Sequence, residues 1–312
     1  MLTAAARPQW PAAVSSLVLE AVTGPLRQAR VLGAFPTCVY LDLGEHDAVL
    51  ALLAREALLQ PISLRLAASS AEIRWGVIPG DTVAVGAGRV RLPSADVVAA
   101  RVHHPARVTS APNPDRVNSI FAHTLPNRVN SSCASRLDPG DLALTDLARD
   151  LAAAALAGRP VAPHLRGLIG AGAGLTPSGD DAVAGVLLAL RSAGRLDAVG
   201  RIASQLRPLL TRTTSISAAL LRAAAEGYAV PEVVTLVEAV HGSTNRKSGP
   251  IPPDSAPFDD WFRLVDPRLV ERVLAIGHSS GRDLVSGIIG VHRALAERLS
   301  PHATTQEGVL HG

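Results

Sequence analysis

The 312-residue chain has little lysine, little cysteine and few aromatic side chains. Lys247 is its only lysine, so the sequence has no Walker A motif for P-loop ATP hydrolysis, and a Schiff-base lysine would have to be Lys247. Cys38 and Cys133 are too few for a disulfide framework or a structural zinc site. Aromatic residues, at 3%, leave few rings for stacking on bases, and the formal charge is only +3. We therefore expect no nucleic-acid partner.

Long hydrophobic runs are also missing, although 47% of the residues are hydrophobic. No stretch of about 18 uncharged apolar residues occurs, and the first 22 residues lack a compact apolar core after a basic start. We therefore expect a cytoplasmic protein that does not enter a membrane. The hydrophobic content is ample for one large domain or two ordinary ones.

Short β-type runs dominate residues 31–108, where glycine, proline, aspartate and serine separate them. We predict a small β-barrel or sandwich as an N-terminal domain over residues 1–112. One helical insert, HDAVLALLAREALL, is expected at 46–59. The segment 113–140, rich in proline, asparagine and serine, is predicted to be an irregular connection, either a linker or a loop over a site.

Helical periodicity replaces the β pattern beyond Asp141, and several of the predicted helices end in glycine. We predict helices at 141–158, 180–194, 196–210, 215–227, 231–242, 266–277 and 282–299. Residues 242–260 are expected to form a long loop and 301–312 a frayed tail. The fold class is therefore α+β, with an all-α bundle at 141–300 that carries the site.

A glycine-rich segment at 167–190, GLIGAGAGLTPSGDDAVAGVLLAL, is the main candidate for a binding site. Ser178 is placed as the N-cap of the helix that follows, with Asp181 at its third position, as in a capping box. Gly185 leaves room for a neighbouring backbone. The backbone N–H groups of residues 170–174, together with the helix dipole, make a suitable site for an anion.

The same pattern returns about a hundred residues later, in GHSSGRDLVSG at 277–287. Both copies read Ser-Gly-x-Asp-x-x-x-Gly at the head of an apolar helix, which suggests two helices that form a pair and face one pocket. The variable position is Asp180 in the first copy and Arg282 in the second. Asp180 would be an acceptor or base, and Arg282 an anion clamp or the partner of Asp180.

A third helix entrance that carries hydroxyl groups is expected at 211–217, TRTTSIS. Simpler interpretations stay open for the two serine-glycine motifs, which can be helix caps alone. The pair His103 and His104 is interpreted as surface, because no carboxylate or cysteine completes a metal site. Cys133 has no evident partner for nucleophilic catalysis.

These motifs resemble a known protein family. LIGAGAGLTPSGDDAVAG, TTSISAALLRAAAEG and AIGHSSGRDLVSGIIG are similar to the AllH family, found beside FdrA-type proteins in bacterial ureide and purine catabolism. The similarity is specific over the helical half and faint over the β-rich half. It implies a subunit of oxamate carbamoyltransferase, which interconverts oxalurate and phosphate with oxamate and carbamoyl phosphate, in a complex with FdrA-type subunits. It implies no metal or other cofactor and assigns no catalytic residues.

The chemistry of carbamoyl transfer suggests roles for the motif residues. The reaction needs a phosphate cradle, a donor to the carbamoyl oxygen and a base for the attacking nitrogen. The backbone amides of residues 170–174, with Thr176 and Ser178, could supply the cradle. His278 or Arg282 could be the donor, and Asp180 or Asp181 the base. The predicted catalytic residues are Asp180, Asp181 and His278. The predicted substrate-binding residues are Gly172, Gly174, Thr176, Ser178, Gly179, Thr214, Ser217, Ser279, Ser280, Gly281, Arg282 and Asp283.

Two other functions compete with a catalytic carbamoyltransferase subunit. The chain could be a non-catalytic scaffold or regulatory subunit of an FdrA-type complex, which binds its partner through the β-rich half. A metal-dependent hydrolase that uses Asp180 and Asp181 would need further ligands, and the sequence does not offer them.

Overall fold

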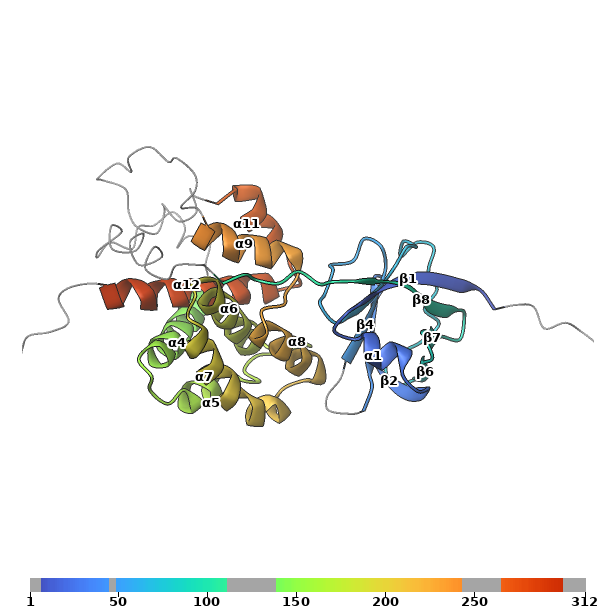
Figure 1. Ribbon diagram of the computed structural model, residues 1–312, viewed down its shortest axis with the longest axis horizontal. Coiled ribbons are helices and arrows are strands. Elements are labelled where there is room, and N and C mark those ends of the chain that lie inside the picture. The colour runs from blue at the N-terminus through green and yellow to red at the C-terminus, as the bar shows by residue number, and fades with distance from the viewer. Residues whose placement is uncertain (1–6, 45–48, 111–138, 243–264, 300–312) are drawn as a thin grey trace, which may run out of the picture.

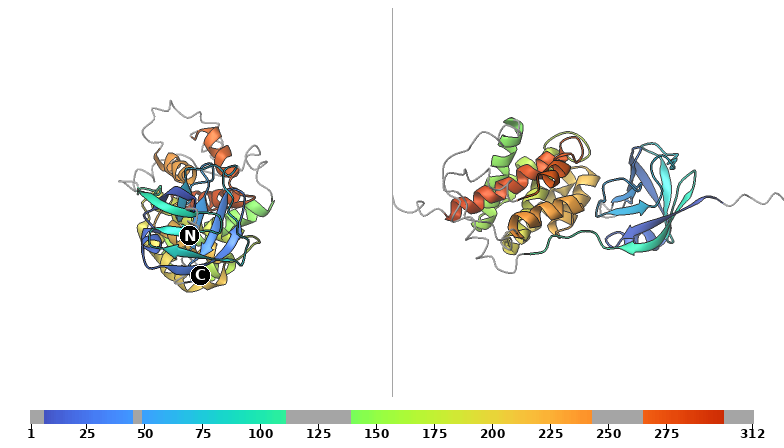
Figure 2. Two further views of the ribbon diagram at one scale, coloured as in Figure 1. Left: turned by 90° about the vertical axis from the view of Figure 1, so that its right-hand side faces the viewer. Right: turned by 90° about the horizontal axis from the view of Figure 1, so that it is seen from above.

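The protein has a β-barrel at its N-terminal end and a group of helices after it (Figure 1). The computed structural model describes residues 7–44, 49–110, 139–242 and 265–299. Figure 2 shows the same two parts from two further directions, with the chain that leaves the barrel running along the helical part. The predicted α+β class is confirmed. Of the two predicted alternatives for the N-terminal domain, the structure is a closed barrel and not a sandwich.

Eight strands close the barrel in the order β1-β5-β4-β3-β2-β6-β7-β8. The strands are β1 (Gln9–Ser15), β2 (Arg27–Ala34), β3 (Cys38–Asp42), β4 (Val49–Leu53), β5 (Ser63–Leu66), β6 (Thr82–Gly86), β7 (Arg89–Arg91) and β8 (Asp96–His103). β1 pairs in parallel with β8, which closes the ring, and β4 pairs in parallel with β5. Apolar side chains from most of the strands form one core.

The predicted helix at 46–59 is wrong, because its central part is the strand β4. All five residues of β4 are buried, so the alternation of apolar and polar residues that normally reveals a strand is missing. An uninterrupted apolar run is compatible with a buried helix as well as a buried strand. The rest of the predicted helix follows the strand without helical structure, and residues 45–48 lie outside the described ranges.

The β structure also begins earlier than the predicted start at Val31. β1 starts at Gln9, 22 residues before that position, and β2 starts at Arg27. A short helix, α1 (Leu19–Thr23), connects the two strands. Pro11 lies within β1. A proline makes a strand harder to predict from sequence, because it has no N–H to donate to the hydrogen bonds between strands. A shift of register between Ala12 and Ala13 interrupts the pairing with β8 just after this proline.

The helical part follows the predicted pattern closely, with one helix missed. Its helices are α4 (Pro139–Leu156), α5 (Ala162–Leu168), α6 (Ser178–Ser192), α7 (Leu196–Leu206), a 3-10 turn (Arg207–Arg212), α8 (Ser215–Ala225), α9 (Pro231–Gly242), α11 (Pro267–Leu274) and α12 (Ser280–Leu299). The sequence analysis did not predict α5, which has only seven residues. A single large apolar cluster runs through these helices.

Glycines let α12 approach its neighbours closely. A side-chain carbon on Gly287 would collide with the backbone oxygen of Ala182 in α6, and one on Gly185 would collide with the backbone oxygen of Leu284 in α12. The predicted role of Gly185 as a site of close backbone approach is therefore confirmed. On another face of α12, a side-chain carbon on Gly290 would lie 2.7 Å from the backbone nitrogen of Arg149 in α4.

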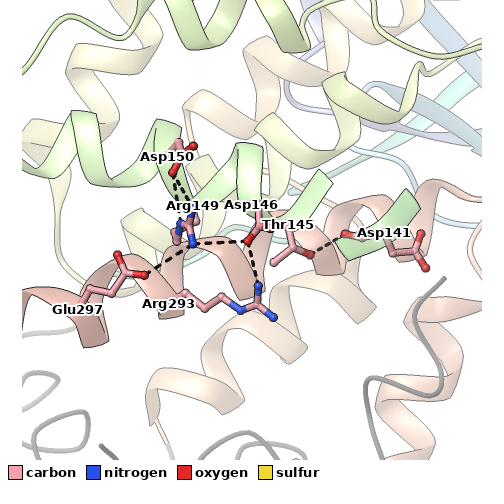
Figure 3. A network of polar contacts seen from close by, with 7 residues as sticks. All are labelled: Asp141, Thr145, Asp146, Arg149, Asp150, Arg293 and Glu297. Carbon is pink, nitrogen blue, oxygen red and sulfur yellow. Dashed lines mark hydrogen bonds and ion pairs between the residues drawn. The ribbon is translucent and has the colours of Figure 1, made fainter. Parts of the chain in front are cut away.

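An ion-pair network also joins α4 to α12 (Figure 3). Arg149 of α4 lies 3.0 Å from Asp150, 3.5 Å from Asp146 and 3.9 Å from Glu297 of α12. Arg293 of α12 approaches Asp146 to 3.2 Å. These side chains are substantially exposed, so each pair contributes little to stability.

The barrel and the helices meet at α8. Ile216 and Ala219 of α8 are buried and belong to the apolar cluster of the barrel, which explains why both faces of β4 are covered. Beyond β8, the backbone N–H of Val108 donates to the Gly227 carbonyl at 2.9 Å, and Arg107 lies over the Tyr228 ring. The first turns of α8 therefore pack on the barrel, and the chain that leaves the barrel is bound to the residues that follow α8.

Several predicted segments lie outside the described residues. They are most of the connection 113–140, most of the loop 242–260 and the tail 301–312, together with Cys133 and Lys247. Pro139 and Gly140, predicted to belong to the connection, are the first residues of α4. Among the described helices, none combines the length and apolar character that a membrane span needs.

Candidate functional site

The glycine-rich segment forms an exposed loop between α5 and α6. Gly170, Gly172 and Gly174 adopt positive φ angles of 78°, 119° and 94°, which side chains of L-residues rarely tolerate. A side-chain carbon on Gly172 would also lie 2.7 Å from the Ser178 nitrogen, and one on Gly170 would collide with the Arg212 carbonyl. The glycines are therefore required by the path of the chain at this point.

Asp180 holds this loop in place from the first turn of α6. The carboxylate accepts a hydrogen bond of 2.9 Å from the Gly170 N–H, one of 2.7 Å from the Ser217 hydroxyl and a third from the Thr213 hydroxyl. Its exposure is 1%. Asp180 is thus the acceptor that joins the loop to the entrance of α8, and it does not pair with Arg282.

Thr214 begins α8 and joins it to the same loop. As the N-cap residue, its side chain accepts from the Ser217 N–H at 3.0 Å, and its hydroxyl donates to the Leu175 carbonyl. The prediction of a helix entrance within 211–217 is confirmed. Leu175 also reaches the barrel, because a side-chain carbon on Gly33 of β2 would lie 3.8 Å from Leu175 Cδ1.

The middle of the loop presents free backbone donors. Gly172, Ala173 and Gly174 are exposed, and within the described part of the chain their N–H groups have no hydrogen-bond partner. They precede the N-terminus of α6, where the helix dipole favours negative charge. The arrangement can receive an anion.

The prediction that Ser178 caps α6 is wrong. Pro177 is the N-cap residue, and its carbonyl accepts from the N–H groups of Asp180 and Asp181 at 2.9 and 3.2 Å. The third helical position is then Asp180, and proline has no N–H that its carboxylate could accept from, so a capping box cannot form. Ser178 is instead the first residue of the helix, and no side chain caps this end.

The two serine-glycine motifs have matching structural positions. α6 and α12 begin at Ser178 and Ser280, and the next residue in each is a glycine without room for a side chain. A side-chain carbon on Gly179 would collide with the carbonyl of Leu168 in α5, and one on Gly281 would collide with that of Val273 in α11. In each case, therefore, the motif begins a long helix, and its glycine lets that helix contact the short helix that precedes it.

The entrances of these two long helices touch directly. The Thr176 and Ser280 hydroxyls lie 2.9 Å apart, and both bond to the Asp181 carboxyl. Burial raises the pKa of Asp181 to about 7 and outweighs the bonds from Ser280 and Thr176, which lower it. The negative charges of Asp283 and Asp180 raise it further by smaller amounts. The structure thus brings a perturbed carboxyl group to the place where the two motifs meet.

The remaining predicted residues of the second motif differ in their burial and their partners. His278 is exposed in the turn before α12, Ser279 is partly buried, and Asp283 is buried. Arg282 forms an ion pair with Asp141 of α4, with 2.6 Å between Nη2 and Oδ2. Asp141 and Thr213 are polar partners in the site that the predicted set left out, and only their contacts across the fold reveal them.

Two further observations bear on chemistry. In the described ranges, no three histidine, cysteine, aspartate or glutamate side chains gather as a metal site would require. A hollow of about 530 Å³ lies between α4, α7 and α12, lined in part by Arg195, Arg201 and Arg298, and its lining includes no residue of the glycine loop.

Comparison with known proteins supports the family suggested by the motifs. Residues 168–251 match the family model described as oxamate carbamoyltransferase subunit AllH. This match confirms the resemblance, and it covers the glycine loop, α6 and α8 but not the second motif at 277–287. No curated protein and no solved structure matches the chain.

Proposed function

We propose that this chain is a subunit of an oxamate carbamoyltransferase-like enzyme of purine or ureide catabolism. In this proposal, the glycine loop binds the phosphate of carbamoyl phosphate or the carboxylate of oxamate or oxalurate. The observation that carries the proposal is the row of exposed, unpartnered N–H groups at Gly172, Ala173 and Gly174, in a loop fixed by Asp180. The family match over the same residues supports the substrate class.

Each part of the site has a role in this proposal. The loop amides, with Thr176 and Ser178, neutralise the anionic end of the ligand. His278 donates to the carbamoyl oxygen as negative charge develops there, because the Arg282 guanidinium is bound to Asp141. Ser279 and the N-terminal turn of α12 form the opposite wall. FdrA-type proteins are the proposed partner subunits.

Ligand binding tests this proposal through thermal stability. We expect carbamoyl phosphate or oxamate, at about one hundred times its Kd, to stabilise the protein by about 2.7 kcal/mol and to raise its Tm by several degrees. Thr176→Ala and His278→Ala should reduce the shift, since the first removes a hydroxyl at the loop and the second removes the proposed donor to the carbamoyl oxygen. Differential scanning calorimetry with each ligand measures the effect.

His104→Ala and Thr235→Ala are matched controls for this experiment. His104 is an exposed histidine beyond β8, and Thr235 is an exposed threonine on α9. Both control variants should keep the full ligand shift. A wild-type protein whose Tm is unaffected by either ligand would refute the proposal.

The barrel supports a second candidate function, that of a non-catalytic scaffold or regulatory subunit. Large hydrophobic side chains are exposed on it, including Leu26 at 49% and Ile78 at 67%. In that case the assembled complex would be active, and substitution of Thr176 or His278 would leave the activity unchanged.

A further inference from the structure

Asp181 and Asp283 are a pair of buried carboxyl groups without a cationic partner. Each is the fourth residue of its helix, α6 or α12, at the matching position of the two motifs. Their exposures are 8% and 4%. Within the described part of the chain neither forms an ion pair, whereas Arg282, next to Asp283, is bound to Asp141.

One oxygen of each carboxyl group lacks any hydrogen-bond partner. Asp181 Oδ2 and Asp283 Oδ2 are both buried, and no donor reaches either of them. A buried carboxylate oxygen without a donor is costly, and the negative charge of Asp283 adds to that cost at Asp181. A proton on one carboxyl group removes a charge and turns an acceptor into a donor.

Two hydroxyl groups connect this pair with the glycine loop. Thr176 and Ser280 bond to each other and to Asp181, and both side chains are only partly buried. A hydroxyl group can donate one hydrogen bond while it accepts another. A proton can therefore move between Asp181 and a ligand at the loop without opening the helix contact.

We propose that Asp181 and Asp283 hold one proton between them, and that the Ser280 and Thr176 hydroxyls pass it to and from the ligand bound at the glycine loop. The second half of this inference rests on the proposed function. The negatively charged groups that act on Asp181 are Asp283 of α12 and Asp180 of its own helix.

The proton transfers balance in a carbamoyl transfer. As the nitrogen of oxamate bonds to the carbamoyl carbon, the bond from that carbon to the phosphate oxygen breaks. The pair gives its proton, through the hydroxyls, to the departing phosphate oxygen. It regains the proton that the attacking nitrogen loses, so the pair ends in its starting state.

Carbon-13 NMR of the ligand-free protein, labelled at its aspartate carboxyl carbons, tests the shared proton. We expect one carboxyl resonance to titrate with a midpoint near pH 7, well above the ordinary aspartate range. Asp181→Asn should abolish this titration. Asp283→Asn should lower its midpoint, because the like charge is removed, while the control Asp150→Asn on the surface of α4 should leave it unchanged.

The same measurement can overturn the inference. Ordinary midpoints for both carboxyl groups would refute it. An unchanged midpoint in Asp283→Asn would show that burial alone protonates Asp181, and a midpoint that moves with added Mg²⁺ or K⁺ would show a cation in place of the proton. Because no ligand is present, failure here is separate from failure of the ligand-binding experiment.

Stability against pH provides an independent check. The pKa of Asp181 is about 7 in the folded protein and 3.8 as its ordinary value, so the folded state binds the proton more tightly. Its contribution to stability is complete below about pH 4 and is lost as the pH rises through 7. We expect this effect to lower the wild-type Tm by roughly 5 to 10 °C between pH 4 and 8, and Asp181→Asn to remove that part.

The hydroxyl relay has its own test. The rate of carbamoyl transfer by the assembled complex, measured in H2O and in D2O, reports whether proton transfer limits the reaction. We expect kcat to fall at least about tenfold in Ser280→Ala, with a larger solvent isotope effect, while the KM for carbamoyl phosphate changes little. A Ser280→Ala protein with the wild-type kcat and solvent isotope effect would refute the relay.

Discussion

Replacing Gly287 by alanine should lower the free energy of unfolding by about 3 kcal/mol. The added methyl group would meet the Ala182 carbonyl in α6, which is backbone and cannot rotate away. α6 and α12 would have to separate, and the contact between Thr176 and Ser280 would be strained with them. Chemical denaturation with urea measures the change as a shift of the midpoint.

Gly200→Ala is the matched control for that substitution. Gly200 lies in the interior of α7, is exposed and has open space where the methyl group would go. Alanine should therefore stabilise this helix by about 0.5 to 1 kcal/mol through its better helix propensity. If Gly287→Ala is as stable as the wild type, the close crossing of α6 and α12 is wrong.

Replacing Asp180 by alanine should destabilise the protein by about 3 kcal/mol and abolish ligand binding at the glycine loop. The change leaves the Gly170 N–H and the hydroxyls of Thr213 and Ser217 without their buried acceptor. The loop would then lose its connection to the entrance of α8. Urea denaturation and the calorimetric ligand shift measure the two effects.

Two further variants decide how Asp180 acts. Asp180→Asn keeps one oxygen for the Gly170 N–H, and its amide can donate to the two hydroxyls, so it should retain most of the stability. Asp150→Ala removes an exposed carboxylate and should cost less than about 1 kcal/mol. An Asp180→Ala protein with a normal ligand shift would mean that the loop needs no anchor.

The sequence predicted the fold best where local pattern and tertiary environment agree. The helices α4, α6, α8, α9 and α12 show clear periodicity or glycine ends, and they appear near the predicted places. In β4 the local pattern and the tertiary environment disagree, because α8 covers one face of the strand and the barrel core covers the other face. Burial on both faces removes the alternation on which strand prediction depends.

The candidate site shows the same division. The glycine loop, the helix that follows it and the second copy of its motif at 277–287 could be predicted directly from the sequence. The capping prediction failed at Ser178 because Pro177 is the N-cap residue and has no N–H to offer. The positions of Thr213 and Asp141 depend on contacts between residues 33 and 141 positions apart, which no local pattern contains.

By itself, therefore, the sequence determined the glycine loop, the two related helix entrances and the family that they resemble. Only the tertiary structure decided that Asp180 is an anchor, that Arg282 is bound to Asp141 and that Asp181 lies buried beside a second carboxyl group. The physical reason is that a side chain's chemistry depends on its partners and its burial. Both arise when helices distant in the sequence pack together.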